Sequence, residues 1–107
     1  MTYSVEWHND HVRMLDQRLL PREEHYVDFY HTDDVAEAIR NMTVRGAPAI
    51  GVAAAYGVVL AASKGGADSA TVEKAIALLA STRPTAVNLF AALDRMRRVL
   101  REHNGGN

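Results

Sequence analysis

TVRGAPAIGVAAAYG, residues 43–57, decides the fold, because it opens the most apolar segment of the chain. Within residues 49–62 only Tyr56 carries a polar side-chain atom, so a helix here has no hydrophilic face to turn toward water. Pro48 suits the first turn of such a helix, where its missing N–H would have had no partner. The segment therefore predicts a central helix, running to about Ser63, that the rest of the chain surrounds.

Three more helices are predicted around this one. From Thr32 to about Thr43 the apolar residues recur at helical spacing, and Thr32, Asp33 and Asp34 are candidate N-caps. A glycine-containing loop then leads to a third helix, which Asp68 or Ser69 caps. The apolar faces of the last two helices are Val72, Ile76 and Leu79 in the third, and Leu89, Leu93, Met96 and Leu100 in the fourth.

The first 30 residues instead predict a small sheet. Residues 4–8 alternate apolar with polar, and the alternation resumes at Val12 after Asn9-Asp10, a two-residue hairpin loop. Residues 25–30 are rich in aromatic and β-branched residues and form a third strand. The fold class is therefore α+β: a three-stranded antiparallel sheet at 4–30, then a four-helix bundle at 32–103. Residues 104–107 are expected to be a linker or a frayed end.

Composition narrows the functional classes. The 107 residues suffice for about one domain, and 48% hydrophobic with 23% charged residues is ordinary globular usage. The net charge of −1 gives no overall field for nucleic acid or an anionic membrane. There is no cysteine, no signal peptide is recognisable, and no uninterrupted apolar run reaches about 18 residues. We expect a cytoplasmic domain that binds neither membrane nor nucleic acid.

Two arginines stand just before predicted helix starts. Arg45-Gly46-Ala47 precedes the central helix, and Arg83 precedes Pro84 and the last helix. Free N–H groups at a helix start, together with guanidinium groups, are suited to a phosphate if the two ends converge. The alternative is that both arginines are surface charges beside ordinary turns.

Other chemical sites are less well supported. His8 and His11 flank a hairpin turn, and the remaining histidines show no ligand spacing with them, so we expect no metal. The arginines of the last helix are interrupted by Asp94 and Glu102, as on a solvated face. No nucleophile constellation is present, and no cofactor is expected.

Several motifs carry a family resemblance. In order and spacing they resemble the N-terminal part of the methylthioribose-1-phosphate isomerase family, whose superfamily includes regulatory subunits of translation initiation factor 2B and a ribose bisphosphate isomerase. The resemblance extends from Ser4 to about His103. The matching motifs are Glu6-Trp7, Leu15-Asp16-Gln17 with Leu19-Leu20-Pro21, residues 44–51 (VRGAPAIG) and residues 83–89 (RPTAVNL).

The resemblance implies a reaction and a site. The reaction is the conversion of methylthioribose 1-phosphate to methylthioribulose 1-phosphate in methionine salvage. The resemblance implies that the substrate-binding residues of the family correspond to Arg45, Gly46, Ala47 and Arg83. The catalytic cysteine and aspartate belong to a Rossmann-like second domain that is absent here, so no catalytic residue is assigned and the chain alone is expected to be inactive. Full-length relatives are expected to be homodimers.

Two other functions remain open. One is a domain of a regulatory subunit related to translation initiation factor 2B, which binds protein partners and a sugar-phosphate or nucleotide effector. The other is a helical adaptor without a ligand. The Arg45 and Arg83 elements and the Leu15-Asp16-Gln17 segment favour the isomerase.

Overall fold

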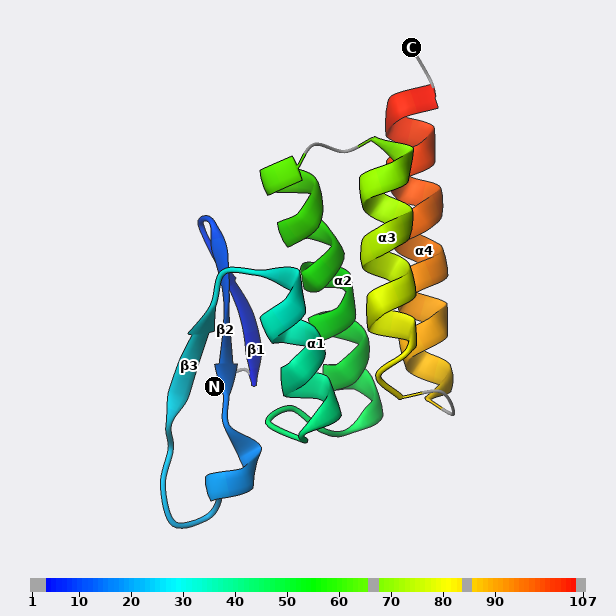
Figure 1. The fold of residues 1–107 in the computed structure, drawn as a ribbon. Helices are drawn as coiled ribbons and strands as arrows, with labels where there is room; N and C mark the ends of the chain where they lie inside the picture. The colour runs from blue at the N-terminus through cyan, green and yellow to red at the C-terminus, as the bar shows by residue number, and fades with distance from the viewer. Residues whose placement is uncertain (1–3, 66–67, 84–85, 106–107) are drawn as a thin grey trace.

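The computed structural model describes residues 4–65, 68–83 and 86–105, and it has the expected α+β architecture. A three-stranded sheet packs beside a bundle of four helices (Figure 1). A short 3-10 helix, Gln17–Leu19, follows the second strand. The other elements are β1 (Val5–His8), β2 (His11–Leu15), β3 (Tyr26–Phe29), α1 (Thr32–Arg40), α2 (Ala47–Gly65), α3 (Ser69–Ala80) and α4 (Val87–Gly105).

The sheet is an antiparallel meander in the order β1-β2-β3, as expected. Asn9 adopts a φ of 56°, which fits the tight turn between β1 and β2. Successive residues of each strand point to opposite faces of the sheet. One face, built from the pairs Val5–Met14, Trp7–Val12 and Val12–Phe29, packs toward the helices, while Glu6, Arg13 and Asp28 lie side by side on the other.

Helix α2 lies at the centre, as its composition predicts. It contacts α1, α3 and α4 as well as β1 and β2, and Ala53, Ala54, Val58 and Leu60 are buried. By length and composition alone, its stretch Ala47–Lys64 would also suffice to cross a membrane. Its neighbours on several sides are those of a core helix, and they explain why it lacks a polar face.

The helices alternate in direction. In Figure 1, α2 and α4 run the same way, whereas α1 and α3 run the opposite way. The packing of early α2 on early α4 agrees: a Cβ on Gly51 would lie 3.4 Å from the Asn88 carbonyl oxygen and 3.7 Å from the Ala92 Cβ. Helices α2 and α4 therefore begin at the same end of the bundle.

Helix α1 corrects two expectations. It ends at Arg40 rather than near Thr43, because Asn41 Oδ1 accepts hydrogen bonds from the Thr43 backbone and hydroxyl and starts a turn in which Met42 has a φ of 69°. Its N-cap is His31, which makes no side-chain cap hydrogen bond. The Thr32 hydroxyl instead donates to the Gly57 carbonyl oxygen of α2 at 2.8 Å.

The start of α3 agrees with the sequence. The Asp68 side chain accepts from the Thr71 backbone N–H at 3.1 Å. Hydrogen bonding from the side chain and the backbone of Thr71 holds the pKa of Asp68 below its ordinary value. Of the expected elements, Gly66, Ala67, Pro84, Thr85 and tail residues 106–107 lie outside the described residues.

Candidate functional site

The start of α2 is an exposed turn built around a glycine. Gly46 has a φ of 90°, a conformation that residues with a Cβ rarely adopt, and its carbonyl oxygen accepts the first helical hydrogen bond from Ile50 at 2.9 Å. Arg45, Gly46, Ala47 and Pro48 are all exposed. This turn presents a cationic side chain and the free N–H groups of a helix start to solvent together.

A groove of about 380 Å³ lies beside this turn. Arg45 and Gly46 form part of its wall together with residues of early α2, and the sheet side supplies the rest. Its lining residues are Ser4, Val5, Gln17, Arg45, Gly46, Pro48, Ala49 and Val52. Two of the four expected site residues therefore lie in one groove, while Ala47 is exposed at the first position of α2.

The loop that carries Arg45 is held firmly. Thr43 is buried, and its carbonyl oxygen accepts from the Gln17 backbone N–H at 2.8 Å. The Val44 N–H donates to the Ala38 carbonyl oxygen at 3.3 Å, and Val44 is fully buried. Buried anchors on both the sheet side and the helix side fix the backbone from which the Arg45 side chain extends.

Arg83, the fourth expected residue, lies in the turn after α3. Its carbonyl oxygen accepts from the Ala86 N–H at 3.0 Å, just before α4 begins. Its Nη1 is buried and has no hydrogen-bond partner within the described part of the chain. An unpartnered buried guanidinium nitrogen is costly, so an acceptor that reached it would be bound favourably.

The two helix starts lie close together, although the two arginines do not share the first groove. A second groove, of about 360 Å³, runs between α2 and α4 and is lined by Gly51, Asn88 and Ala92, among others. It shares Pro48 and Val52 with the first groove. Arg83 is not among the residues that line either of these two grooves.

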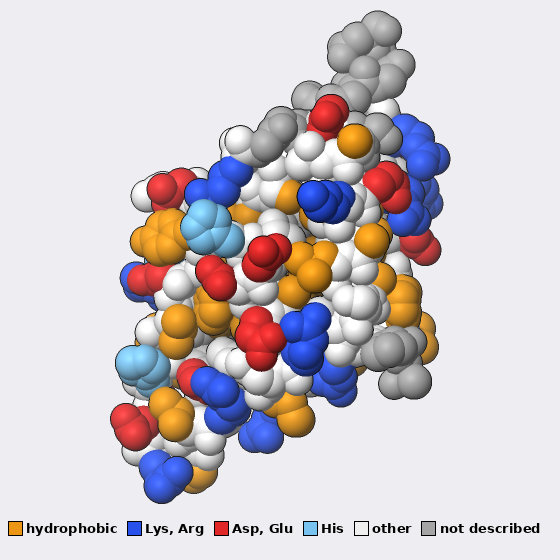
Figure 2. All heavy atoms as spheres, viewed as in Figure 1, with side chains coloured by type: hydrophobic (Ala, Val, Ile, Leu, Met, Phe, Trp, Pro, Cys, Tyr) orange, Lys and Arg blue, Asp and Glu red, His pale blue; other side chains and the backbone are white. Residues whose placement is uncertain are grey.

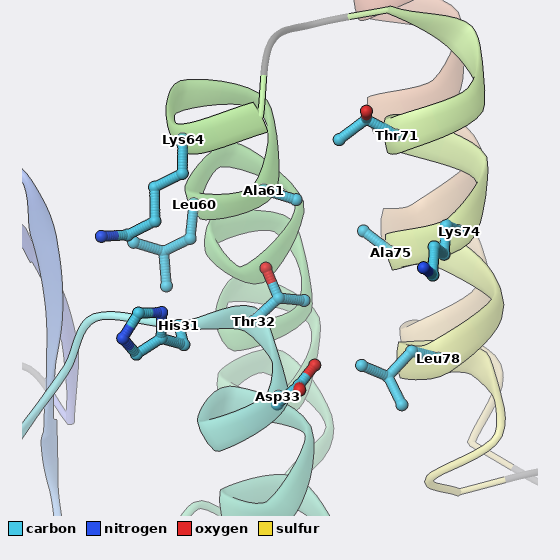
Figure 3. Close-up of a pocket in the computed structure, with 10 residues that line it drawn as sticks. All are labelled: His31, Thr32, Asp33, Leu60, Ala61, Lys64, Thr71, Lys74, Ala75 and Leu78. Atoms are coloured by element: carbon cyan, nitrogen blue, oxygen red, sulfur yellow. The ribbon is translucent and has the colours of Figure 1, made fainter.

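A larger cavity, of about 500 Å³, lies elsewhere, between α2, α3 and the start of α1 (Figure 3). Its floor is largely apolar, with Leu60, Ala61, Ala75 and Leu78. Lys64 and Lys74 stand at its rim together with the carboxylate of Asp33, so its charge is mixed. The cavity contains none of the four expected site residues, and we do not assign the site to it.

The outer face of the sheet holds a cluster of ion pairs. Arg13 Nε donates to Asp28 Oδ1 at 2.8 Å, and this bond holds the pKa of the Asp28 carboxyl below its ordinary value. His11 Nε2 lies 3.1 Å from the same oxygen, and its Nδ1 lies 2.9 Å from Asp10. In residues 4–65, 68–83 and 86–105, no group of three His, Asp or Glu side chains is placed to hold a metal ion.

The face drawn in Figure 2 carries no field of a single sign. Acidic and basic side chains are interspersed over it. On α4, Arg97 is neutralised by Glu73 of α3 at 2.7 Å and by Asp94 at 2.9 Å, and the Arg97 bond lowers the pKa of Glu73. On this face, an anion site must therefore be local.

The chain is similar in sequence to known proteins. The model of the Initiation factor 2 subunit family matches residues 43–107. The methylthioribose-1-phosphate isomerase of Marinobacter nauticus is 55% identical over 100 residues, which cover 92% of this chain and 28% of that protein. The corresponding protein of Pseudomonas paraeruginosa is 51% identical over 108 residues, covering 97% of this chain and 30% of the relative.

Two solved structures of related proteins are also similar to this chain. The 5-methylthioribose 1-phosphate isomerase from Pyrococcus horikoshii superposes with a TM-score of 0.88 at 48% identity, over 96% of this chain and 30% of that one. The translation initiation factor eIF-2B subunit delta from A. fulgidus gives a TM-score of 0.77 at 30% identity, over 98% of this chain and 36% of that one. The chain spans about 30% of the length of the curated relatives it matches.

Proposed function

Because the chain belongs to the Initiation factor 2 subunit family, we propose that it is the N-terminal, sugar-phosphate-binding portion of an isomerase of methionine salvage. The reaction converts methylthioribose 1-phosphate to methylthioribulose 1-phosphate. The relatives named as this isomerase, at 51–55% identity, supply the choice of substrate.

One observation carries the proposal: Arg45 and Gly46 line a solvent-open groove at the start of α2, at the end of the bundle where α4 also begins. A phosphate there would meet a guanidinium group and unpaired backbone N–H groups. Arg83, whose Nη1 has no hydrogen-bond partner among the residues that the structure describes, stands just before α4 and supplies the second cation. Arg45, Gly46, Ala47 and Arg83 are the proposed substrate-binding residues.

The chemistry explains why binding alone is the task of this portion. A phosphate on the anomeric carbon blocks ordinary ring opening, so the enzyme must hold the phosphate while acid and base groups open the ring and move a hydrogen between adjacent carbons. The resemblance assigns those groups, a cysteine and an aspartate, to a Rossmann-like second domain. The 107-residue chain is therefore proposed to be inactive alone.

The proposed partners follow from the same argument. They are the sugar phosphate, the C-terminal Rossmann-like domain of a longer chain, and a second copy in a homodimer. The proposed location is the cytoplasm.

A regulatory subunit related to translation initiation factor 2B is the second candidate. It is favoured by one observation, the TM-score of 0.77 to the delta subunit from A. fulgidus. In that role the groove would bind an effector rather than a substrate, and partner proteins would respond to the binding.

The experiment is an NMR assay of methylthioribose 1-phosphate with two proteins: the longest reading frame that contains this chain, and the 107-residue chain alone. Turnover by the longer protein only is the expected result. No turnover by a folded longer protein would favour the regulatory candidate. Turnover by the short chain would contradict the proposed division of labour.

A further inference from the structure

A neutral polar side chain stands in the same groove as Arg45. Gln17 lines the groove together with Arg45 and Gly46, and the remaining polar side chain in the lining is that of Ser4. Gln17 belongs to the Leu15-Asp16-Gln17 motif, for which the family resemblance implies no role. Its place in the groove makes it a candidate for contact with whatever Arg45 binds.

The backbone of Gln17 is fixed by bonds on both sides. Its N–H donates to the carbonyl oxygen of Thr43 at 2.8 Å, two residues before Arg45. The preceding residue, Asp16, is buried and accepts from Arg18 Nε at 2.9 Å and Nη2 at 2.8 Å. Gln17 and Arg45 are thus held by two chain segments that share a hydrogen bond.

The side chain of Gln17, by contrast, has no assigned partner. Its amide makes no hydrogen bond to any other residue that the structure describes, although the amide has two donor hydrogens and an acceptor oxygen. A fixed backbone with an uncommitted amide at the wall of an open groove is suited to contacting a ligand, because the backbone is already ordered and only the side chain has rotamer freedom to lose on binding.

Arg45 and Gln17 offer different chemistry. A guanidinium group and helix N–H groups suit a dianionic phosphate, whereas a neutral amide that both donates and accepts suits a hydroxyl group. We propose that Gln17 binds a hydroxyl of the sugar while Arg45 holds the phosphate, so that Gln17 determines specificity for a sugar phosphate over phosphate alone. This proposal rests on the proposed function of the groove.

The test is a calorimetric titration of the longer protein with methylthioribose 1-phosphate and, separately, with inorganic phosphate. Gln17→Met keeps the length of the side chain and removes its hydrogen bonds. We expect it to weaken sugar-phosphate binding about two- to tenfold, the usual effect of one neutral hydrogen bond, and to leave the affinity for inorganic phosphate unchanged. The matched control, Arg45→Met, should weaken both ligands.

Three results would overturn the proposal. They are an unchanged sugar-phosphate affinity in Gln17→Met, an equal loss for both ligands, and a wild-type protein that binds sugar phosphate no better than phosphate. The isomerase function is judged separately by turnover. A wild-type protein without turnover whose preference for sugar phosphate disappears in Gln17→Met would support the role of Gln17 and contradict the enzyme activity.

Discussion

Gly51 of α2 faces the backbone of Asn88 of α4, and a Cβ on Gly51 would lie 3.4 Å from the Asn88 carbonyl oxygen. This is ordinary van der Waals contact, so a methyl group at position 51 would fit between α2 and α4 without a clash. Gly57, further along α2, is more crowded. A Cβ there would lie 3.1 Å from Leu79 Cδ1 and 3.3 Å from Val35 Cγ1.

The two glycines predict opposite responses to alanine. Gly51→Ala should be neutral or stabilise the fold by up to about 1 kcal/mol, because alanine favours the helix and fits the space. Gly57→Ala should destabilise it by about 1–2 kcal/mol, because buried side chains from two other helices must move. Urea denaturation followed by circular dichroism measures both, and a more stable Gly57→Ala would show that Leu79 relaxes freely.

Replacing Gly46 is expected to lower the stability of the fold because of backbone strain rather than crowding. A Cβ would meet nothing within 4 Å among the described atoms, but the φ of 90° is strained for any L-residue. Gly46→Ala should destabilise the chain by about 1–2 kcal/mol. Gly46→Asn should cost less, because asparagine tolerates positive φ, and Gly46→Val should cost more. Equal unfolding free energies for the three variants would contradict this order.

Arg45 and Arg83 are both expected to contribute to sugar-phosphate binding, and their contributions are expected to depend on each other. In the longer protein, Arg83→Ala and Arg45→Ala should each weaken sugar-phosphate binding by about 1.5–3 kcal/mol, the range for a hydrogen bond to a charged group. If both guanidinium groups hold one phosphate, the double variant should depart from additivity by at least about 0.5 kcal/mol. Titration of the four proteins measures this, and strict additivity would place the arginines at separate sites.

Asp16 predicts a dependence of stability on pH. Hydrogen bonds from the Arg18 side chain hold the pKa of its carboxyl below the ordinary value of 3.8. The unfolded chain therefore binds the proton more readily, and the carboxylate stabilises the fold fully at pH values above about 5. That contribution is lost as the pH falls past 3.8 and through the folded pKa.

Asp16→Asn should accordingly cost about 1.5–3 kcal/mol at pH 7, and the difference from wild type should shrink in acid. The control is Asp28→Asn, which removes a carboxylate from a more exposed ion pair and should cost less. Unfolding free energies at pH 7 and pH 3 test this, and a difference that persists unchanged at pH 3 would exclude the carboxylate as the cause.

Local patterns predicted most of the fold, because each element follows from its own residues. The alternation at residues 4–8 and 11–15 predicted the hairpin, and the spacing of Leu89 and Leu93 predicted the buried face of α4. The end of α1 was predicted wrongly, since Met42 continues the helical spacing while the Asn41 side chain ends the helix. The spacing of apolar residues alone does not reveal such a competing hydrogen bond.

The candidate site was predictable in part. Arg45 and Gly46 were recognisable as residues before a helix that lacks an obvious cap. Their proximity to Gln17 was not, because it depends on the bond between Gln17 and Thr43, which lie 26 positions apart, and no local pattern encodes such a contact. The substrate-binding roles of Arg45, Gly46, Ala47 and Arg83 stay predictions.

The contact between Trp7 and Tyr56 has a practical consequence. Trp7 is the only tryptophan of the sequence, and its ring packs 5.8 Å from that of Tyr56 at the junction of the sheet and α2. Its fluorescence therefore reports whether the sheet is docked, independently of helix content. Since Ser4 and Val5 of the sheet side and Arg45 of the helix side line one groove, this single fluorophore indicates whether both walls of the groove are together before any ligand is added.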